Sequence, residues 1–435
     1  MDEEKNPTSK CCMTKTKCFI ICILVTIIII LYEYSLPKRS SSLTRQYMDS
    51  SIDQDRLKVL DKIVNDLEEK QKDMSPKSRS LWTKMFGSKS SSSRDKLVLL
   101  YTGFFGDLPW GWIKDTKTLN QWDGITCPHF HCRLTYNKSD IKIADAVIFH
   151  AEDMLTSDDL NELQLSRNPR QRWIFFPTES PANVGTEHVI NGVFNWTMSY
   201  RHDADIFRPY GYYYPITGHQ EGDFLEFMEG KDLFVVWLSS HLGLMRDKYV
   251  RRLRIWIKID VFGKTGIAVG GRSGLCTKDS PDCKKHLKRY KFLLAFENSF
   301  CTDYITEKYW FALEMGVVPV VMGGADYEKM GIPGSYIHVK DFPTIKALAD
   351  YLKRLDLNDK EYSKYFEWKN KYRVLNDSPW TCQLCTALNI DKRIKVYDRL
   401  EDLWWPEREC GIKEDIVKKI IGRQQWNGTR KTRYD

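Results

Sequence analysis

Glu179 is a residue whose type and position suggest chemistry, because it closely follows an apolar run. The run RWIFF (172–176) ends three residues earlier, and Pro177 and Pro181 restrict the loop around Glu179. A carboxylate at a strand end can act as a general base, although a solvated loop acid is the commoner role of a glutamate. The sequence therefore indicates Glu179 as a candidate base.

Arg246 lies where a helix is expected to begin after the apolar run LFVVWL (233–238). A cation at a helix start opposes the helix dipole unless an anion lies nearby. The forked donors of arginine suit phosphate, so Arg246 is a candidate anion ligand. The basic residues between 248 and 254 are better explained as a solvated helix face.

The stretch FENSFCTDYITEK (296–308) combines aromatic, acidic and basic residues. The run before it, KFLLAF (291–296), is expected to be a strand that ends in the site. Asp303 is the expected N-cap of the following helix, which Gly316 ends.

Lys308 is the residue of this stretch that a bare helix does not explain. Glu307 suits the dipole at a helix start, whereas a cation there loses about 0.3–1 kcal/mol. A bound diphosphate would reverse that sign, since helix N-termini favour anions. The stretch therefore predicts a nucleotide-sugar site, and the alternative is a surface pair between Glu307 and Lys308.

Short apolar runs recur through the chain and must position these residues. Helix-like amphipathic stretches lie between several of them, which predicts parallel sheets covered on both faces. Ligands bind such folds beyond the carboxyl ends of the strands. The runs occupy 97–101, 145–150, 172–176, 233–238, 257–263, 291–296, 317–322 and 336–339.

An uncharged run at 18–32, extended to Leu36, predicts a membrane-spanning signal anchor. Basic residues flank it, and no clear cleavage site follows, although a cleaved signal peptide is the alternative. Four N-x-S/T acceptors follow the run and indicate that the C-terminal portion is lumenal: Asn137, Asn195, Asn376 and Asn427. The expected plan is a cytoplasmic tail (1–17), the anchor (18–36), a stem (37–95), an N-terminal domain (96–230) and a C-terminal domain (231–435).

The chain has 12 cysteines, of which eight follow the anchor. An even number allows complete pairing in an oxidising compartment. A zinc site built from C-x4-C and C-x2-C is the alternative, but oxidation opposes thiolate ligands. The eight disulfide candidates are Cys127, Cys132, Cys276, Cys283, Cys301, Cys382, Cys385 and Cys410.

Several function classes have little support in the sequence. The net charge is +8 and basic residues do not form long runs, so nucleic-acid binding is not expected. No P-loop, H-E-x-x-H or G-x-S-x-G motif occurs. The tripeptide DAD (203–205) resembles a metal-binding D-x-D, but so short a pattern is better explained as a loop or helix face.

The motif at 296–308, with RYKFLLA before it and VVPVVMGG after it, resembles the α1,3-fucosyltransferases of glycosyltransferase family ten. ADAVIFH, FNWTMSYRHDADIFRPYG, IDVFG and YFEW resemble the same family in the same order. The similarity spans about residues 97 to 400. ESPAN and CTKDSPDC resemble invertebrate members more than vertebrate ones.

The resemblance implies an α/β fold of the GT-B type, with two Rossmann-like domains behind the anchor and stem. The N-terminal domain would meet the acceptor and the C-terminal domain GDP-fucose, with inversion at fucose C1 and no obligatory cofactor or metal. Glu179 would be the base, and DAD is not a metal site in this family. Donor-binding roles are implied for Arg246, Asn298, Tyr304, Glu307 and Lys308.

The family also implies that Cys127 and Cys132 join Cys382 and Cys385, in a way that ties the N-terminal half to the end of the chain. The order of the other four cysteines stays open.

The expected protein is a single-pass type II Golgi membrane enzyme that fucosylates a GlcNAc-containing glycan. Core GlcNAc of an N-glycan, antennal LacNAc and LacdiNAc all stay open as acceptors, and so does a homodimer. Trp110 and Trp112 are candidates for stacking on a sugar, although core packing is expected for at least one. The rivals are an inactive glycan-binding protein of the same fold and a sulfotransferase, for which a phosphate-binding motif is missing.

Overall fold

The computed structural model describes residues 95–410 apart from several short gaps. The gaps are 114–118, 120, 123–124, 128–130, 166, 186–188, 216–223, 242, 264–275, 277–279, 376, 392 and 394. The expected tail and anchor, and the stem up to residue 94, lie outside the described residues. Within the described part of the chain, no helix has the length and apolar character needed to cross a membrane.

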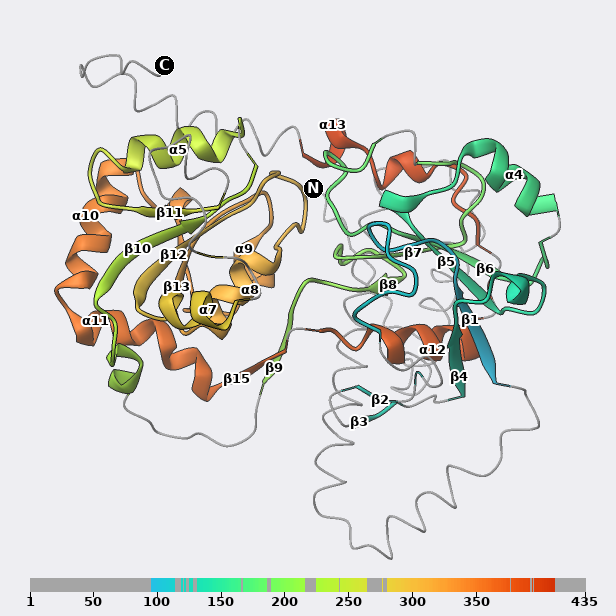
Figure 1. The fold of residues 1–435 in the computed structure, drawn as a ribbon, viewed down its shortest axis with the longest axis horizontal. Coiled ribbons are helices and arrows are strands. Elements are labelled where there is room, and N and C mark those ends of the chain that lie inside the picture. Colours follow the sequence, from blue (N-terminus) through green and yellow to red (C-terminus); the bar gives the residue numbers. More distant parts are fainter. Residues whose placement is uncertain are drawn as a thin grey trace, which may run out of the picture. The chain divides into compact units, whose positions relative to one another are not determined.

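The first sheet has six parallel strands in the order β4-β1-β5-β6-β7-β8 (Figure 1). Three of them match the predicted apolar runs, whereas β4, β7 and β8 were not predicted as strands. β4 alternates buried and exposed residues, as suits a strand at the edge of a sheet. The strands are β1 (Lys96–Leu100), β4 (Cys132–Thr135), β5 (Ala146–His150), β6 (Arg172–Phe176), β7 (Trp196–Ser199) and β8 (Ile206–Phe207).

The second sheet has five parallel strands in the order β11-β10-β12-β13-β14. Pro319 lies within β13, opposite Leu293, and pairing with β14 begins only at the next residue, Val320. This placement lets a central strand accept a residue that has no backbone N–H. The strands are β10 (Leu233–Leu238), β11 (Asp260–Phe262), β12 (Tyr290–Phe296), β13 (Val318–Met322) and β14 (Ile337–His338).

Helices cover both faces of the second sheet, as the continuous apolar runs predicted (Figure 1). α5 (Met245–Leu253), α10 (Ile345–Asp356) and α11 (Asp359–Ser363) pack on one face. α7 (Pro281–Leu287), α8 (Glu307–Glu314) and α9 (Tyr327–Met330) pack on the other. Thr344 caps α10 by accepting a hydrogen bond from the amide of Ala347.

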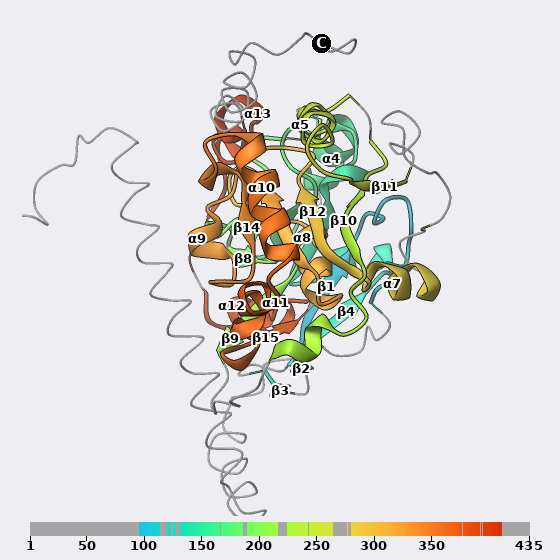
Figure 2. The same cartoon turned by 90° about the vertical axis from the view of Figure 1, so that its left-hand side faces the viewer.

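The first sheet is covered partly by the end of the chain. α12 (Trp380–Ile390) packs on one face, while α4 (Ser157–Leu165) and residues near η7 (Leu400–Asp402) pack on the other. The chain leaves along β9 (Tyr212–Pro215) and returns along the antiparallel β15 (Tyr372–Leu375), which lie side by side in Figure 1 and Figure 2. Residues 380–388 and 400–410, which the prediction assigned to the C-terminal domain (231–435), therefore pack on the first sheet.

The remaining short elements connect these layers. They are β2 (Gln121–Trp122), β3 (Ile125–Thr126), η1 (Lys138–Lys142), η2 (Ala151–Asp153), η4 (Phe224–Met228), η5 (Val339–Asp341), η6 (Lys364–Asn370) and α13 (Pro406–Glu409).

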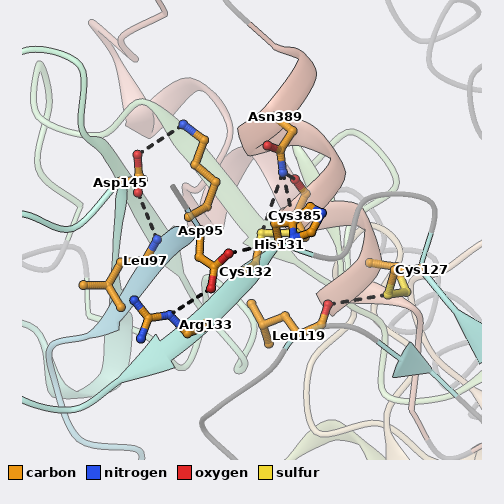
Figure 3. The surroundings of a disulfide bond; sticks show 12 residues. Asp95, Leu97, Leu119, Cys127, His131, Cys132, Arg133, Asp145, Cys385 and Asn389 are labelled. Carbon is orange, nitrogen blue, oxygen red and sulfur yellow. Dashed lines mark hydrogen bonds and ion pairs between the residues drawn. A yellow bond between two sulfur atoms is a disulfide. The ribbon is translucent and has the colours of Figure 1, made fainter. Parts of the chain in front are cut away.

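Four disulfides join the eight predicted cysteines, so the zinc alternative is wrong for these pairs. Cys132 bonds to Cys385 on α12, where the Asn389 amide also contacts both sulfur atoms (Figure 3). The implied link from the first half to the end of the chain is confirmed, and the open pairings are now assigned. The bonds are Cys127–Cys382, Cys132–Cys385, Cys276–Cys283 and Cys301–Cys410.

Candidate active site

The loops that follow β6 and β12 meet although they belong to different sheets. The Ser180 hydroxyl donates to Ser299 Oγ at 2.9 Å, and the Tyr304 hydroxyl donates to Glu179 Oε2 at 3.0 Å. Parallel sheets bring functional groups together at the carboxyl ends of their strands. The predicted base and the predicted donor-binding residues therefore share one cluster.

Glu179 is half-buried and accepts all its side-chain hydrogen bonds on one oxygen. Oε2 receives Tyr304 Oη at 3.0 Å, Asn183 Nδ2 at 2.8 Å and Asn298 Nδ2 at 3.5 Å. Among the described residues, none donates to Oε1. Asn298 Oδ1 is buried and also has no partner there. The carboxylate is thus held in place while one oxygen stays available to a ligand hydroxyl.

Tyr304 is almost fully buried beside Tyr200 and Tyr210. Burial raises the pKa of Tyr304 well above its ordinary value, and the nearby Glu179 acts in the same direction. The phenol therefore stays protonated and donates to Glu179. The Tyr210 hydroxyl donates to the carbonyl of Thr178 at 2.6 Å and supports the same loop.

Arg246 is the second residue of α5 and is buried. Its Nη1 donates to the Phe296 carbonyl at 2.9 Å and its Nη2 lies 3.3 Å from Ser239 Oγ. Its Nε is buried without a partner among the described residues. Burial lowers the pKa of Arg246, whereas Glu297 and Asp247 oppose that shift. The guanidinium therefore spans the ends of β10 and β12.

Glu297 was not predicted as a site residue. It directly follows β12, and its fully buried side chain contacts Thr306, the N-cap of α8. Its carboxylate accepts hydrogen bonds from the Thr306 amide (2.8 Å) and hydroxyl (2.7 Å) and pairs with Lys308 Nζ at 3.2 Å. Burial raises the pKa of Glu297, although Lys308 opposes the shift. Burial lowers the pKa of Lys308, but the carboxylates of Glu297 and Glu307 outweigh it and raise the pKa.

This arrangement revises the interpretation of Lys308. The helix begins at Glu307 and has its own anion in Glu297, so a ligand is not the sole partner for the lysine. Glu307 is 42% exposed and lies 3.2 Å from Lys308 Nζ. The predicted surface pair therefore exists as well, but beside a buried carboxylate.

The prediction of Asp303 as the helix N-cap is wrong, because Thr306 occupies that position. Asp303 adopts a positive φ of 58° and lies three residues before the N-cap. Its Oδ2 accepts a hydrogen bond from the His202 amide at 3.2 Å and lies 3.5 Å from His202 Nδ1. The side chain is used to attach this loop to the first half rather than to cap α8.

Glu152 and His150 form a second group that the sequence did not single out. Glu152 Oε1 accepts a hydrogen bond from the Glu179 amide at 2.5 Å, and its Oε2 lies 2.9 Å from His150 Nε2. Burial opposes the shift, but the His150 ring holds the pKa of Glu152 below its ordinary value. His150 ends the predicted run 145–150 and Glu152 lies two residues beyond it, so the strand-end rule would have found both.

The acids of DAD are engaged within the protein. Asp203 pairs with Arg201 at 2.6 Å. Asp205 accepts a hydrogen bond from the Thr197 amide at 2.9 Å and pairs with Lys395 at 2.6 Å. The tripeptide therefore organises a loop of the first half.

The two tryptophans proposed for stacking differ in exposure. Trp110 is 1% exposed and packs in the core of the first half. Trp112 is half-buried, and the Arg208 guanidinium lies 4.4 Å from its ring centroid. Core packing is therefore the role of Trp110.

The predicted glycosylation sites also differ. Asn137 is exposed beside η1 and suits a glycan. Asn195 does not: its Oδ1 accepts a hydrogen bond from the Trp173 amide at 2.8 Å and its Nδ2 donates to the Lys395 carbonyl at 2.7 Å. A glycan would displace this packing, so that prediction is corrected. Asn376 and Asn427 lie outside the described residues.

Two family models match the chain and together span both sheets. "Fucosyltransferase, N-terminal" matches residues 93–211, and "Glycosyltransferase family 10 (fucosyltransferase) C-term" matches residues 228–404. The Drosophila melanogaster protein "Alpha-(1,3)-fucosyltransferase C" is 32% identical over 352 residues, covering 74% of this chain and 80% of its own. The Mus musculus protein "Alpha-(1,3)-fucosyltransferase 7" is 36% identical over 307 residues, covering 68% and 74%.

A solved structure, "Crystal Structure of alpha1,3-Fucosyltransferase with GDP-fucose", covers 71% of this chain and 95% of its own. Its TM-score is only 0.43 at 17% identity, so the family assignment rests on the sequence matches. On those matches, the chain belongs to the fucosyltransferases of glycosyltransferase family 10.

Proposed function

We propose that the protein is an α1,3-fucosyltransferase that moves L-fucose from GDP-fucose, with inversion, onto a GlcNAc-containing glycan. The observation that carries this proposal is the contact of Glu179 with Tyr304 and Asn298. It joins a candidate base in one half to candidate donor ligands in the other. Relatives named as α1,3-fucosyltransferases support the reaction and the linkage.

Glu179 acts on the acceptor in this mechanism. The acceptor hydroxyl oxygen attacks fucose C1 and loses its proton to the carboxylate as the new C–O bond forms. The bond from C1 to the GDP oxygen breaks on the opposite face, which inverts the configuration at C1. Tyr304 and Asn183 hold the carboxylate, and Oε1 is the oxygen that other described residues leave available.

Arg246 and Lys308 act on the leaving group. Negative charge grows on the diphosphate as GDP departs, and fixed cations in a buried site stabilise it. Arg246 has a buried Nε without a partner among the described residues, which suits an added anion. Glu307, beside Lys308, is placed to accept hydrogen bonds from hydroxyl groups of the donor.

The wider setting is part of the same proposal. The two sheets suit a GT-B enzyme, with acceptor binding on the first half and GDP-fucose binding on the second. The uncharged run at 18–32, extended to Leu36, and the later N-x-S/T acceptors support a type II anchor in the Golgi membrane. Four disulfides agree with an oxidising lumen.

The proposal is tested with purified lumenal protein, GDP-fucose and a panel of core-GlcNAc, LacNAc and LacdiNAc glycans. We expect one fucose added per acceptor, with an α1,3 linkage by product analysis. Binding of GDP-fucose or glycan without transfer to any acceptor would instead support the inactive glycan-binding alternative. Transfer of sulfate would support the sulfotransferase alternative.

A further inference from the structure

A buried carboxylate–histidine–carboxylate bridge lies at the end of β5. It consists of His150, Glu152 and Asp153, and the proton transfer described above does not use it. The His150 ring is completely buried, while the Glu152 and Asp153 side chains are 10% and 19% exposed. Three ionisable groups in so dry a place are costly unless they pair.

Glu152 accepts hydrogen bonds from the loop that carries the proposed base, Glu179. Its Oε1 accepts hydrogen bonds from the Thr178 amide at 3.1 Å, the Thr178 hydroxyl at 3.0 Å and the Glu179 amide at 2.5 Å. One oxygen therefore fixes two consecutive residues of the loop after β6. The peptide from which the Glu179 side chain projects cannot shift without breaking these bonds.

His150 connects Glu152 to a second carboxylate. Its Nε2 lies 2.9 Å from Glu152 Oε2, and its Nδ1 lies 2.6 Å from Asp153 Oδ2. Nε2 also makes a hydrogen bond with Thr178 Oγ1 at 3.2 Å, and that hydroxyl donates to Glu152 Oε1. The ring therefore packs between the two acids and, through Thr178, is linked to the same loop that Glu152 holds.

Asp153 anchors the bridge to the loop after β1. Its two oxygens accept hydrogen bonds from the amides of Phe105 and Gly106, each at 2.7 Å. Both residues have positive φ, 50° for Phe105 and 87° for Gly106. The strained turn and the two amide contacts give the bridge a fixed attachment away from the base.

We propose that Glu152 is a positioning residue for Glu179, held in place by His150 and Asp153. This inference rests on the proposed function, because it concerns the residue that takes the acceptor proton. Glu152 acts through the backbone of the base loop and touches no reacting atom. Displacing a catalytic group by about 1 Å can cost on the order of 10²-fold in rate.

The test compares two substitutions of Glu152 with a control. Glu152→Ala removes the acceptor of all three hydrogen bonds, and we expect kcat to fall about 30-fold with unchanged binding of GDP-fucose. Glu152→Gln keeps a carbonyl oxygen for the loop amides, so we expect it to recover most of that loss. Glu162→Ala, at an exposed glutamate on α4, should leave kcat unchanged.

A double-mutant cycle separates positioning from a general structural role. If Glu152 acts through Glu179, adding Glu152→Ala to Glu179→Gln lowers kcat no further. If the double variant instead loses kcat by the product of the two single losses, the inference is overturned. A rise in the acceptor KM alone in Glu152→Ala would also overturn it. If Glu152→Ala does not fold, the same cycle is run with Glu152→Asp, whose shorter side chain withdraws the accepting oxygen from the Thr178 and Glu179 amides; multiplying losses there would likewise overturn the inference.

Failure of the inference and failure of the proposed function give different results. A wild-type enzyme that transfers fucose together with a fully active Glu152→Ala variant refutes only the positioning role. A wild-type protein that transfers no fucose to any acceptor refutes the function, and with it this inference.

Discussion

The two strand ends that build the site are organised in different ways. After β6, Tyr304 and Asn183 donate hydrogen bonds to the Glu179 carboxylate, and the Glu179 amide donates to Glu152. After β12, oppositely charged groups lie together, with Glu297 pairing with Lys308. The first arrangement fixes the position of the Glu179 carboxylate. The second balances charge at the place where the donor diphosphate is proposed to bind. Changes on the first side should therefore cost rate, and changes on the second should also cost donor binding.

The largest effect is expected for Glu179→Gln, which removes the base but keeps the shape of the side chain. Transfer should fall on the order of 10³-fold, since positioned bases contribute about 10²–10⁴-fold. Binding of GDP-fucose, measured by calorimetry, should stay nearly intact. Equal loss of transfer and binding would refute the role of Glu179 as base and weaken the contrast between the two sides.

Lys308→Gln should have the next largest effect, because it removes a cation beside buried Glu297. We expect kcat to fall about 10²-fold. Affinity for GDP should weaken in the same variant, unlike in Glu179→Gln. Lys329→Gln, at an exposed lysine on α9, is the matched control. Unchanged GDP affinity in Lys308→Gln would show that the lysine serves only Glu297.

Asn195→Ala is expected to change stability, because Asn195 belongs to neither of the two groups of residues compared above. Its buried amide satisfies the Trp173 amide and the Lys395 carbonyl, so we expect a loss of about 1–3 kcal/mol in the free energy of unfolding. Denaturant titration measures this loss. The intact masses of the variant and the wild-type protein should show that the variant carries as many glycans as the wild type. Asn137→Gln should instead lose one glycan with little change in stability. A glycan found on Asn195 would contradict the packing described above.

The smallest effect is expected from removing metal ions. In the proposed mechanism Arg246 and Lys308 supply the positive charge, so initial rates should be unchanged after treatment with EDTA. A complete loss of transfer activity that a divalent cation restores would contradict this expectation. It would favour a metal site at Asp203 and Asp205.

Much of the fold was predictable because strands buried on both faces appear as continuous apolar runs. RWIFF and LFVVWL match β6 and β10 residue for residue. β4 could not be found this way, because an edge strand has only one buried face. The placement of α12 on the first sheet also has no local signal, since it depends on contacts with residues about 250 positions earlier.

The site was predictable where chemistry follows a strand end and not where partners come from elsewhere. Glu179 and Tyr304 followed from motif and position, and the structure brings them together. Asp303 was misassigned because its partner, His202, is distant in sequence. The electrostatic argument about Lys308 missed Glu297 because a helix-dipole estimate considers only the helix itself.

The return of α12 to the first sheet has a consequence for biosynthesis. The strands of that sheet emerge from the ribosome early, but the helix that covers one face and the partners of Cys127 and Cys132 are made about 250 residues later. Until those residues are made, the nascent N-terminal half has an exposed apolar surface, and Cys127 and Cys132 lack their disulfide partners. In the proposed oxidising lumen, we expect chaperones and disulfide isomerases to bind this half until translation is complete.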